Sequence, residues 1–371
     1  MPALGVKQGF WRGRRVFVTG HTGFIGGWLC LWLQRLGAQV VGYSLNPPSE
    51  PNLFQSGDIA TGMTSIIADV TDLASLSEAI AGAEPEIVFH LAAQPLVRTA
   101  FHEPVDTFST NVMGTVNLLE AVRQPQSVRA VAVFTTDKVY DNREWVWGYR
   151  ETDRLGGREA YGASKAASEF AVEAYRQSYL SEGDNPVGVA TVRAGNVVGG
   201  GDWADERLVP DAMRAFAGGK KLWIRCPDAV RPWQHVLDPI RGLLLLGERL
   251  YGDVHAFACP WNLGPAEEFA RPVSEVVESL KRLWGKGADW KIDQRIKPYE
   301  ARLLSLNSAR AWGSLGWRPT WDVEEMLVRT VDWYRQFYNG ANMHSISLEQ
   351  IAAYEKSVIA SDGQAAVKKS A

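Results

Sequence analysis

An acid and an amine stand side by side in the segment FTTDKVYD, residues 134–141, directly after a run of apolar residues. The apolar run predicts a buried strand, so Thr136, Asp137 and Lys138 follow at its carboxyl end. Burying a carboxyl and an amine there costs free energy unless the two groups pair or react. Together they are suited to acid–base chemistry, in which one group gives a proton and the other takes one. A simple Asp–Lys ion pair that closes the strand end is the alternative.

A second reactive pair occurs in the segment YGASK, where Tyr161 and Lys165 stand four positions apart. This spacing places both side chains on one face of a helix. A lysine there stabilises a phenolate, so the tyrosine can take a proton from a substrate hydroxyl while hydride leaves the same carbon. The spacing is common by chance and gains weight from Thr136 and from a glycine motif near the amino terminus.

The glycine motif VFVTGHTGFIGGWL, residues 16–29, follows the first predicted strand and opens a helix. Gly20 permits a tight turn, Gly23 lets the backbone approach a pyrophosphate, and Gly26 permits close helix packing. An anion would then lie at the positive end of the helix. The predicted dinucleotide contacts in this motif are Gly20, Thr22, Gly23, Phe24, Ile25 and Gly26.

The second predicted strand ends at Tyr43 and Ser44, where dinucleotide-binding folds carry an acidic residue for the adenine ribose. With no acid and no adjacent arginine, this strand end leaves the choice between NAD and NADP open. Residues at other strand ends are placed to border the adenine and the phosphates. We predict further cofactor contacts from Ser44, Asp69, Val70, Ala92 and Ala93, besides Tyr161 and Lys165.

Six short apolar runs alternate with helical patterns, and all six are expected to be strands buried on both faces: RVFVTG, QVVGYSL, TSIIADV, EIVFHLAA, RAVAVFTT and VGVATVRAG. The alternation predicts an α/β fold, a Rossmann-type doubly wound parallel sheet with a smaller mixed α/β substrate-binding lobe. We expect the dinucleotide-binding domain over residues 1–194 plus about 234–264. The second lobe is expected over about 195–233 plus 265–345, with helices near 273–285 and 322–338. Residues 355–371 are expected to be a disordered tail.

Composition narrows the classes of function. With 371 residues the chain exceeds what one hydrophobic core usually holds, which favours two lobes. A net charge of −3 gives no electrostatic reason to bind nucleic acid or an anionic membrane. Three scattered cysteines predict neither disulfides nor a zinc site, and no cluster has metal-ligand spacing. Because a signal peptide and a membrane-spanning run are also missing from the pattern, we expect a cytoplasmic location.

The glycine motif, Thr136 and the Tyr161/Lys165 pair resemble the extended short-chain dehydrogenase/reductases of the NAD-dependent epimerase/dehydratase family, over roughly residues 10–340. In sugar-nucleotide 4,6-dehydratases of that superfamily the fifth strand ends Thr-Asp-Glu. In the CDP-glucose 4,6-dehydratase branch it ends Thr-Asp-Lys, as here. The segments similar to that branch are GHTGFIGGWL, AAQPLVR, TDKVYDN, EWVWGYRE, RAGNVVGGGDW and RPWQHVLDP.

The resemblance implies an NAD-dependent lyase acting on CDP-glucose. Hydride would move from sugar C4 to NAD⁺ with Tyr161 as base, assisted by Thr136 and Lys165. Lys138 would remove the C5 proton while Asp137 protonates the departing 6-hydroxyl, and hydride would then return to C6. Lys138 must be neutral to act as a base, whereas an ordinary lysine is protonated at pH 7. We expect burial and nearby positive charges to favour its neutral form, with Asp137 and Lys138 sharing protons as a coupled pair.

The resemblance also predicts substrate contacts. It places Asn196 near the sugar or its phosphates and Arg231 near the diphosphate, an anion that a fixed guanidinium suits. The full predicted set is Gln94, Arg98, Asn196, Arg207, Arg231 and Arg302. Trp145 and Trp147, just after the reactive turn, are expected near the substrate. A homodimer is implied in which helices 105–123 and 161–180 form a four-helix bundle across a two-fold axis.

Two other functions stay open on the sequence. One is a dehydratase or 4-epimerase for a different nucleotide sugar, because nothing in composition or periodicity identifies the base. An epimerase has no need of the Asp137–Lys138 pair. The other is a non-enzymatic, cofactor-sensing member of the superfamily, which would have little use for both Tyr161 and Lys165.

Overall fold

The structure is a computed structural model that describes residues 5–265, 269–294 and 301–370, with side chains as far as residue 361. Its centre is a parallel sheet of seven strands in the order β11-β6-β5-β4-β1-β2-β3. The strands are β1 (Arg15–Thr19), β2 (Gln39–Ser44), β3 (Thr64–Ile67), β4 (Ile87–His90), β5 (Ala130–Phe134), β6 (Gly188–Arg193) and β11 (Trp261–Asn262). The chain reverses direction across the sheet between β1 and β4, and doubly wound sheets bind ligands beside such a switch point.

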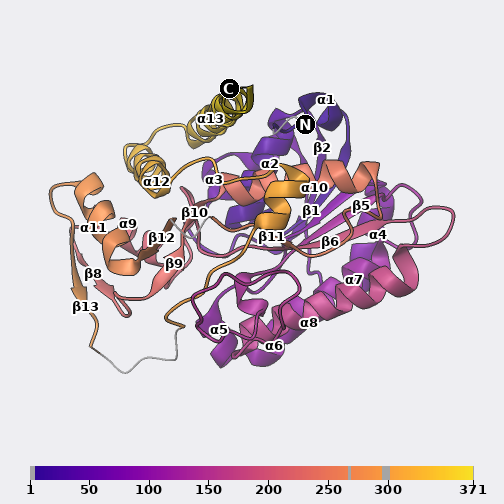
Figure 1. Cartoon of the computed structure of the whole chain (residues 1–371), viewed down its shortest axis with the longest axis horizontal. Helices are drawn as coiled ribbons and strands as arrows, with labels where there is room; N and C mark the ends of the chain where they lie inside the picture. The colour runs from indigo at the N-terminus through magenta and orange to yellow at the C-terminus, as the bar shows by residue number, and fades with distance from the viewer. Residues whose placement is uncertain (1–4, 266–268, 295–300, 371) are drawn as a thin grey trace.

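Helices cover both faces of this sheet, as Figure 1 shows. One face carries α2 (Phe24–Arg35) and α10 (Leu237–Gly252), with α12 (Val323–Tyr338) and α13 (Met343–Ser370) packed beyond them. The other carries α4 (Leu73–Ala83), α7 (Gly114–Ala121) and α8 (Ala160–Tyr175). Each face has its own apolar core, so the predicted Rossmann-type α/β fold is confirmed.

A smaller group of elements lies beyond the carboxyl ends of the strands, at the left of Figure 1. Its members are α9 (Leu208–Ala217), α11 (Val273–Trp284), β8 (Lys221–Ile224) with β13 (Asp289–Ile292), and β9 (Val230–Pro232) with β12 (Ala270–Pro272). Strands β7 (Val197–Val198) and β10 (Gln234–His235) pair with each other in parallel and form a separate two-stranded sheet. The helices predicted near 273–285 and 322–338 are α11 and α12. The domain boundaries stay a prediction.

The other helical segments are short and mostly connect these elements. They are α1 (Gln8–Trp11), α3 (Leu53–Ser56), η1 (Ile59–Gly62), α5 (Val97–His102), α6 (Pro104–Phe108), η2 (Ser109–Met113), η3 (Asp137–Val139), η4 (Arg176–Leu180) and η6 (Ala311–Leu315). Segments α6, η2 and α7 together form the helix predicted over residues 105–123.

The third strand corrects one expectation. All four residues of β4 are buried, whereas Thr64, Ser65 and Ile67 of β3 are exposed. Strand β3 is the edge of the sheet and pairs with β2 alone. The prediction that all six strands are buried on both faces is therefore wrong for β3.

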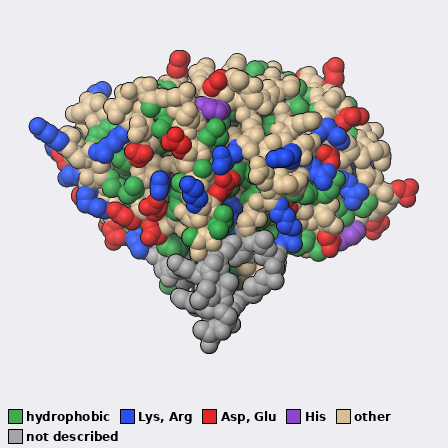
Figure 2. All heavy atoms as spheres, turned by 90° about the horizontal axis from the view of Figure 1, so that it is seen from above, with side chains coloured by type: hydrophobic (Ala, Val, Ile, Leu, Met, Phe, Trp, Pro, Cys, Tyr) green, Lys and Arg blue, Asp and Glu red, His purple; other side chains and the backbone are tan. Residues whose placement is uncertain are grey.

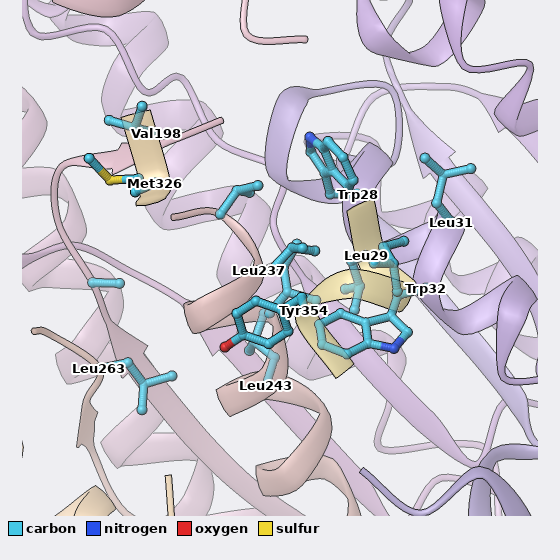
Figure 3. Packing of buried hydrophobic residues seen from close by; sticks show 14 of the residues in the cluster. Trp28, Leu29, Leu31, Trp32, Val198, Leu237, Leu243, Leu263, Met326 and Tyr354 are labelled. Atoms are coloured by element: carbon cyan, nitrogen blue, oxygen red, sulfur yellow. The ribbon is translucent and has the colours of Figure 1, made fainter. Parts of the chain in front are cut away.

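The carboxyl-terminal segment corrects a second expectation. Residues 355–370 continue α13, and Tyr354 and Val358 are buried in the core. The Tyr354 ring packs edge-on against Trp32 at 5.6 Å between ring centroids (Figure 3). Glu355 accepts a hydrogen bond from the Trp32 indole and pairs with Arg35. The prediction of disorder is wrong for this helix; residue 371 lies outside the described residues.

The surface carries both signs of charge. On the face in Figure 2, Lys and Arg side chains lie among Asp and Glu side chains. Within the described ranges no helix is long and apolar enough to cross a membrane. The same ranges hold no group of three or more His, Cys, Asp or Glu side chains placed to bind a metal ion.

Candidate active site

A cavity of about 1010 Å³ lies where the carboxyl ends of the central strands meet α9 and β8. Nearly all the side chains that the sequence singled out line it, although they come from distant parts of the chain. The lining residues among them are Gly20, Thr22, Gly23, Phe24, Ile25, Gly26, Ser44, Asp69, Val70, Ala92, Ala93, Arg98, Thr136, Asp137, Lys138, Tyr161, Lys165, Asn196, Arg207 and Arg231.

The glycine motif forms the floor of the cavity at the start of α2. Gly20 has φ +77°, and a Cβ there would lie 2.6 Å from the Ala92 nitrogen. A Cβ on Gly26 would lie 2.1 Å from the Gly20 oxygen, so both positions require glycine. Gly23 is the N-cap of α2 and has no side chain to occupy the free amides of the first turn. Those amides and the positive helix end form a cradle that fits the diphosphate of a dinucleotide.

The end of β2 borders the same cavity with neutral groups. Ser44 Oγ lies 2.9 Å from Thr22 Oγ1, and the Thr22 hydroxyl donates to the Leu45 carbonyl at 2.9 Å. Asp69 at the far wall accepts from the Thr71 amide at 2.9 Å, which fixes its carboxylate. These hydroxyls can hydrogen bond with a ribose, and no arginine follows Ser44 before α3 to bind an added phosphate.

The acid and the amine after β5 have different environments. Asp137 is fully buried, and its Oδ2 has no partner among the described residues. Lys138 Nζ lies 3.6 Å from Asp137 Oδ1, and 40% of the Lys138 side chain is exposed. The expected burial therefore holds for Asp137 and is wrong for Lys138, whose amine lies in the cavity.

Tyr161 and Lys165 project from the first turns of α8 beside this pair. Lys165 is 2% exposed and donates to the Phe134 carbonyl at 2.9 Å, which ties α8 to the end of β5. Burial lowers the pKa of Lys165 to about 8, while the charge of Glu169 acts in the opposite direction. Burial raises the pKa of Tyr161, and the charge of Lys138 and a hydrogen bond with Thr136 lower it. The site thus places a phenol, a lysine, a carboxyl and an amine around one space.

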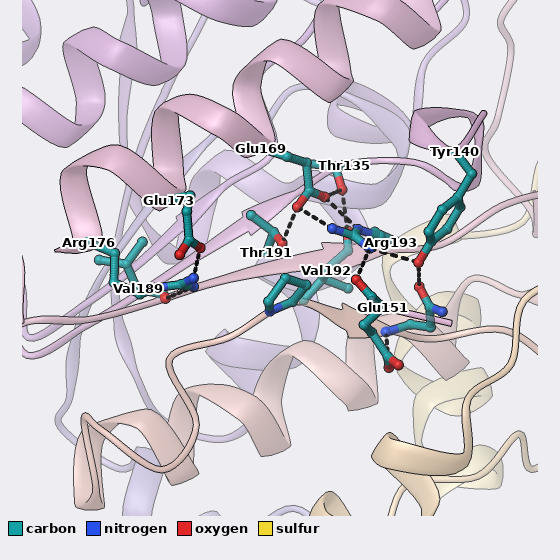
Figure 4. A network of polar contacts seen from close by, with 12 residues as sticks. Thr135, Tyr140, Glu151, Glu169, Glu173, Arg176, Val189, Thr191, Val192 and Arg193 are labelled. Carbon is teal, nitrogen blue, oxygen red and sulfur yellow. Dashed lines mark hydrogen bonds and ion pairs between the residues drawn. The ribbon is translucent and has the colours of Figure 1, made fainter. Parts of the chain in front are cut away.

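An ion pair that the sequence did not single out joins Glu169 of α8 to Arg193 of β6 (Figure 4). Glu169 and Arg193 are 3% and 2% exposed and are joined by hydrogen bonds of 2.8 and 2.9 Å. Thr135 and Thr191 donate to the Glu169 carboxylate at 2.6 Å each. The Glu169 position, four residues after Lys165, is the sequence signal that could have revealed it.

The same network reaches the turn that carries the reactive acid. Arg193 donates to the Tyr140 hydroxyl at 2.8 Å, and Tyr140 donates to Asn262 Oδ1 at 2.7 Å. Tyr140 follows Lys138 by two positions and stacks on Tyr149 at 5.0 Å. The network therefore joins α8, β5, β6 and β11, and fixes the turn from its buried side.

The small-lobe side of the cavity carries arginines and one strained residue. Arg207 pairs with Asp202 at 2.9 Å, and Arg98 pairs with Glu206. Asn196 has φ +47°, a left-handed conformation that costs free energy outside glycine. Its Nδ2 is buried and has no partner among the described residues, so it can donate to a ligand in the cavity.

Four predicted contacts do not lie in the cavity. Gln94 instead hydrogen bonds with Thr107 and Leu96, which fixes the loop after β4, and Arg302 is not among the lining residues. Trp145 and Trp147 do not line the cavity either, and 69% of Trp147 is exposed. Trp145 stacks on Tyr149 at 5.2 Å, and the expectation that these tryptophans lie near the substrate stays a prediction.

Strand β8 supplies lining residues that the sequence analysis missed. Leu222, Trp223 and Ile224 of β8 line the cavity together with Arg225, which follows the strand, and 59% of Trp223 is exposed. The segment KLWIR is a short run of apolar residues between two charged ones, a strand signal that could have revealed it.

Comparison with known proteins gives matches over nearly the whole chain. The family model described as GDP-mannose 4,6 dehydratase matches residues 17–330. The CDP-glucose 4,6-dehydratase of Salmonella typhimurium is 46% identical over 352 residues, 94% of this chain and 98% of that protein. A dTDP-glucose 4,6-dehydratase of Xanthomonas campestris is 28% identical over 359 residues, 91% of this chain and 98% of that protein. The solved structure of MoeE5 in complex with UDP-glucose and NAD has a TM-score of 0.72 at 26% identity, and covers 87% of this chain and 99% of that one.

Proposed function

We propose that this chain, which belongs to the GDP-mannose 4,6-dehydratase family, is an NAD-dependent hydro-lyase that converts CDP-glucose to CDP-4-dehydro-6-deoxyglucose. The observation that carries the proposal is that Asp137 and Lys138 share one cavity with Tyr161 and Lys165. The substrate is assigned from the relatives: identity is 46% with the Salmonella CDP-glucose enzyme and 28% with the dTDP-glucose enzyme.

Each reactive side chain has a proton to move in this reaction. Tyr161 takes the proton of the sugar 4-hydroxyl, and the charge of Lys165 stabilises the phenolate that does so. The ketone formed at C4 acidifies the C5 proton, which Lys138 removes from its exposed position in the cavity. Asp137 protonates the 6-hydroxyl as it departs, from a fully buried position 3.6 Å from Lys138 Nζ.

The proposed cofactor is NAD, which when bound supplies the acceptor and then the donor of hydride. The amides at Gly23 would hold its diphosphate. Thr22 and Ser44 would hydrogen bond with the adenine ribose, and Asp69 would border the adenine. A free cradle at Gly23 and neutral hydroxyls at Ser44 support NAD over NADP.

Substrate phosphates would bind on the small-lobe side. Arg207 and Arg231 would contact the diphosphate with charge-assisted hydrogen bonds, and Asn196 Nδ2 would donate to the sugar or its phosphates. Arg98 would join them after exchanging Glu206 for substrate oxygens.

We also propose a homodimer, formed by the exposed apolar side chains of α6, η2 and α8. Val105, Met113 and Phe170 are 78%, 50% and 62% exposed, and Phe108 and Tyr179 are exposed as well. Burying such a patch against its two-fold copy would remove apolar area from water. Phe170→Glu should then sediment as a 41.0 kDa monomer where the wild type sediments as a dimer. A monomeric wild type at micromolar concentration would contradict the dimer.

The test of the function is incubation with CDP-, dTDP-, UDP- and GDP-glucose, followed by the absorbance that alkali induces in a 4-keto-6-deoxy sugar. We expect product from CDP-glucose and none with Tyr161→Phe. Turnover of another nucleotide glucose in place of CDP-glucose would assign the chain to a sibling dehydratase. A galactose-configured product would indicate a 4-epimerase, and cofactor binding without any turnover would indicate a sensing protein.

A further inference from the structure

The segment 301–307, here called the strap, lies against the reactive turn (residues 136–141) that carries the proposed acid and base. Leu304 of the strap lines the cavity. Leu304 and Leu306 are 5% and 3% exposed, and they belong to one apolar cluster with Val139 of the reactive turn. The strap and the turn therefore share a small core, although they are far apart in the sequence.

The strap also holds an arginine that is proposed to bind the substrate. The Arg302 carbonyl accepts from the Val230 amide at 3.0 Å and from Arg231 Nη1 at 3.3 Å. A β-bridge between Val230 and Leu303 continues this contact. Arg231 lines the cavity, where its guanidinium is proposed to contact the diphosphate. The strap thus contacts both a proposed phosphate-binding residue and the turn that carries the acid–base pair.

Asn142 joins the strap to the reactive turn by hydrogen bonds. Its Nδ2 donates to the Leu303 carbonyl at 3.0 Å. Its Oδ1 accepts from the Tyr149 hydroxyl at 3.1 Å and from the Glu144 amide at 2.9 Å. Asn142 lines the cavity, but it is 8% exposed and both of its polar atoms have partners in the protein. Its side chain therefore holds the chain in place and is not free to bind a ligand.

Tyr149 extends this contact to the reactive turn itself. Its ring stacks on Tyr140 at 5.0 Å between ring centroids, with an angle of 18° between the ring planes. The Tyr149 amide donates to the Ser305 carbonyl at 2.9 Å, and the Tyr149 carbonyl accepts from the Asn307 amide at 2.8 Å. Tyr140 comes two positions after Lys138, so the strap, Tyr149 and the reactive turn form one connected unit.

We propose that Asn142 is a positioning residue for the dehydration step, because it ties the reactive turn to the strap that also holds Arg231. This inference rests on the proposed dehydratase function. Lys138 must reach C5 while the nucleotide is held at its phosphates, so a fixed distance between these two sites lets nucleotide binding orient the sugar. The hydrogen-bond partners of Asn142 lie outside α8, which carries Tyr161 and Lys165, so C4 oxidation does not depend on Asn142.

The test compares the two half-reactions in Asn142→Ala by single-turnover absorbance with CDP-glucose. NADH should form at the wild-type rate. It should then decay to product about 10–10²-fold more slowly than in the wild type, since a misplacement of about 1 Å can cost about 10²-fold in rate. Asn185→Ala is the matched control, because Asn185 Nδ2 also donates to a backbone carbonyl, that of Gln126 at 2.9 Å, and Asn185 does not line the cavity. It should leave both half-reactions unchanged.

Direct contact of Asn142 with the sugar is the competing explanation, and binding measurements distinguish the two. In a Tyr161→Phe background, which prevents turnover, Asn142→Ala should leave the Kd for CDP-glucose unchanged. A residue that contacts the sugar would raise this Kd and slow NADH formation as well.

Tyr149→Phe is the second variant. It removes the hydroxyl that donates to Asn142 and keeps the ring that stacks on Tyr140. The decay of NADH should slow in the same direction and by a smaller factor, and this variant serves if Asn142→Ala fails to fold. A purely structural asparagine would lower the melting temperature and leave the ratio of the two half-reaction rates, per folded molecule, at its wild-type value.

A double-mutant cycle tests the part played by the strap. Arg231→Met should weaken substrate binding and also slow the decay of NADH. Combined with Asn142→Ala it should slow the decay no further, because both changes act through the strap. Independent, additive slowing would overturn the role of the strap.

The outcomes separate this positioning role from the proposed function. Equal slowing of both half-reactions, unchanged rates, or a raised Kd for CDP-glucose in Asn142→Ala overturns the positioning role and leaves the dehydratase function standing. Absence of product from every nucleotide glucose with the wild-type protein overturns the function, and the positioning role with it.

Discussion

Two acid–base pairs lie about the end of β5, and they differ in how completely their hydrogen bonds are satisfied. In the Glu169–Arg193 pair both side chains are almost fully buried, and the carboxylate accepts from Thr135, Thr191 and Arg193. In the Asp137–Lys138 pair the carboxyl is equally buried, yet Oδ2 has no partner among the described residues, and the amine faces the open cavity. Both pairs combine a carboxyl with a basic group, but only the Glu169 carboxylate has hydrogen-bond partners for both of its oxygens.

That difference separates a structural pair from a reactive one. Burial works against the charge of Glu169, and Arg193 outweighs it, so the pKa of Glu169 lies below its usual value. Such a group stays ionised and does not exchange protons with a ligand. A buried carboxyl with a free oxygen and an exposed amine can still exchange protons with a ligand. Unsatisfied polar atoms beside a cavity are therefore the better guide to chemistry in this fold.

The largest effect is expected from Lys138→Met on the reactive pair. Dehydration should fall about 10²–10⁴-fold, the contribution of a general base, while Tyr161 and Lys165 still support C4 oxidation. Bound NADH should therefore accumulate and be visible by its absorbance in single-turnover experiments. Tyr161→Phe is the matched control and should form no NADH. A near-normal rate of product formation by folded Lys138→Met would mean that Lys138 is not the base and that the Asp137–Lys138 pair, like the Glu169–Arg193 pair, is structural.

Arg193→Met should affect stability instead of chemistry. Removing one partner leaves the Glu169 charge buried and unpaired, which costs about 3–5 kcal/mol of the free energy of unfolding. Denaturant unfolding measures this loss. Arg35→Met is the control, because the Arg35–Glu355 pair is about one-third exposed and should be worth about 1 kcal/mol or less. Equal losses in the two variants would mean that the buried pair has no special role.

Gly195→Ala tests whether the position of the Asp137 carboxyl matters for the reaction. A Cβ at this position would lie 2.0 Å from Asp137 Oδ2, so the carboxyl must move. We expect a stability loss of about 1–3 kcal/mol from overpacking, together with a larger loss of dehydration than of C4 oxidation. Gly82→Ala, where a Cβ meets nothing within 4 Å, is the control and should leave both half-reactions alone. Equal activity in the two alanine variants would show that the position of Asp137 is not critical.

The sequence predicted the reactive pair better than the structural one. Thr136, Asp137 and Lys138 are adjacent in the chain, so a strand that ends in polar residues was enough to mark them. Glu169 and Arg193 are 24 residues apart and meet only when β6 lies beside β5 under α8. Local patterns carry no information about such a meeting unless helix spacing supplies it, as Lys165 and Glu169 do here.

The fold shows the same limit. Alternation of apolar runs predicted six of the seven strands, but β11 has only two residues and is defined by its pairing with β6. The tail of α13 has polar composition, which favoured disorder. Val358 of this tail and Ile351 and Tyr354 just before it are nevertheless buried at helical spacing, and α13 is stabilised by packing on α2 and α12 rather than by propensity.

The smallest effect is expected on the pH dependence of C4 oxidation, through Lys165. The pKa of Lys165 is lowered to about 8 by burial, so its amine is charged below that pH and loses its proton above it. A neutral Lys165 no longer stabilises the Tyr161 phenolate, and C4 oxidation should fall about tenfold per pH unit above pH 8. Because the Glu169 charge raises the pKa of Lys165, Glu169→Gln should move this fall to lower pH. NADH formation in a Lys138→Met background measures the first half-reaction alone. Thr191→Val is the control, because it removes a hydrogen-bond donor to Glu169 and keeps the Glu169 charge. An unchanged profile in Glu169→Gln would confine the structural pair to stability.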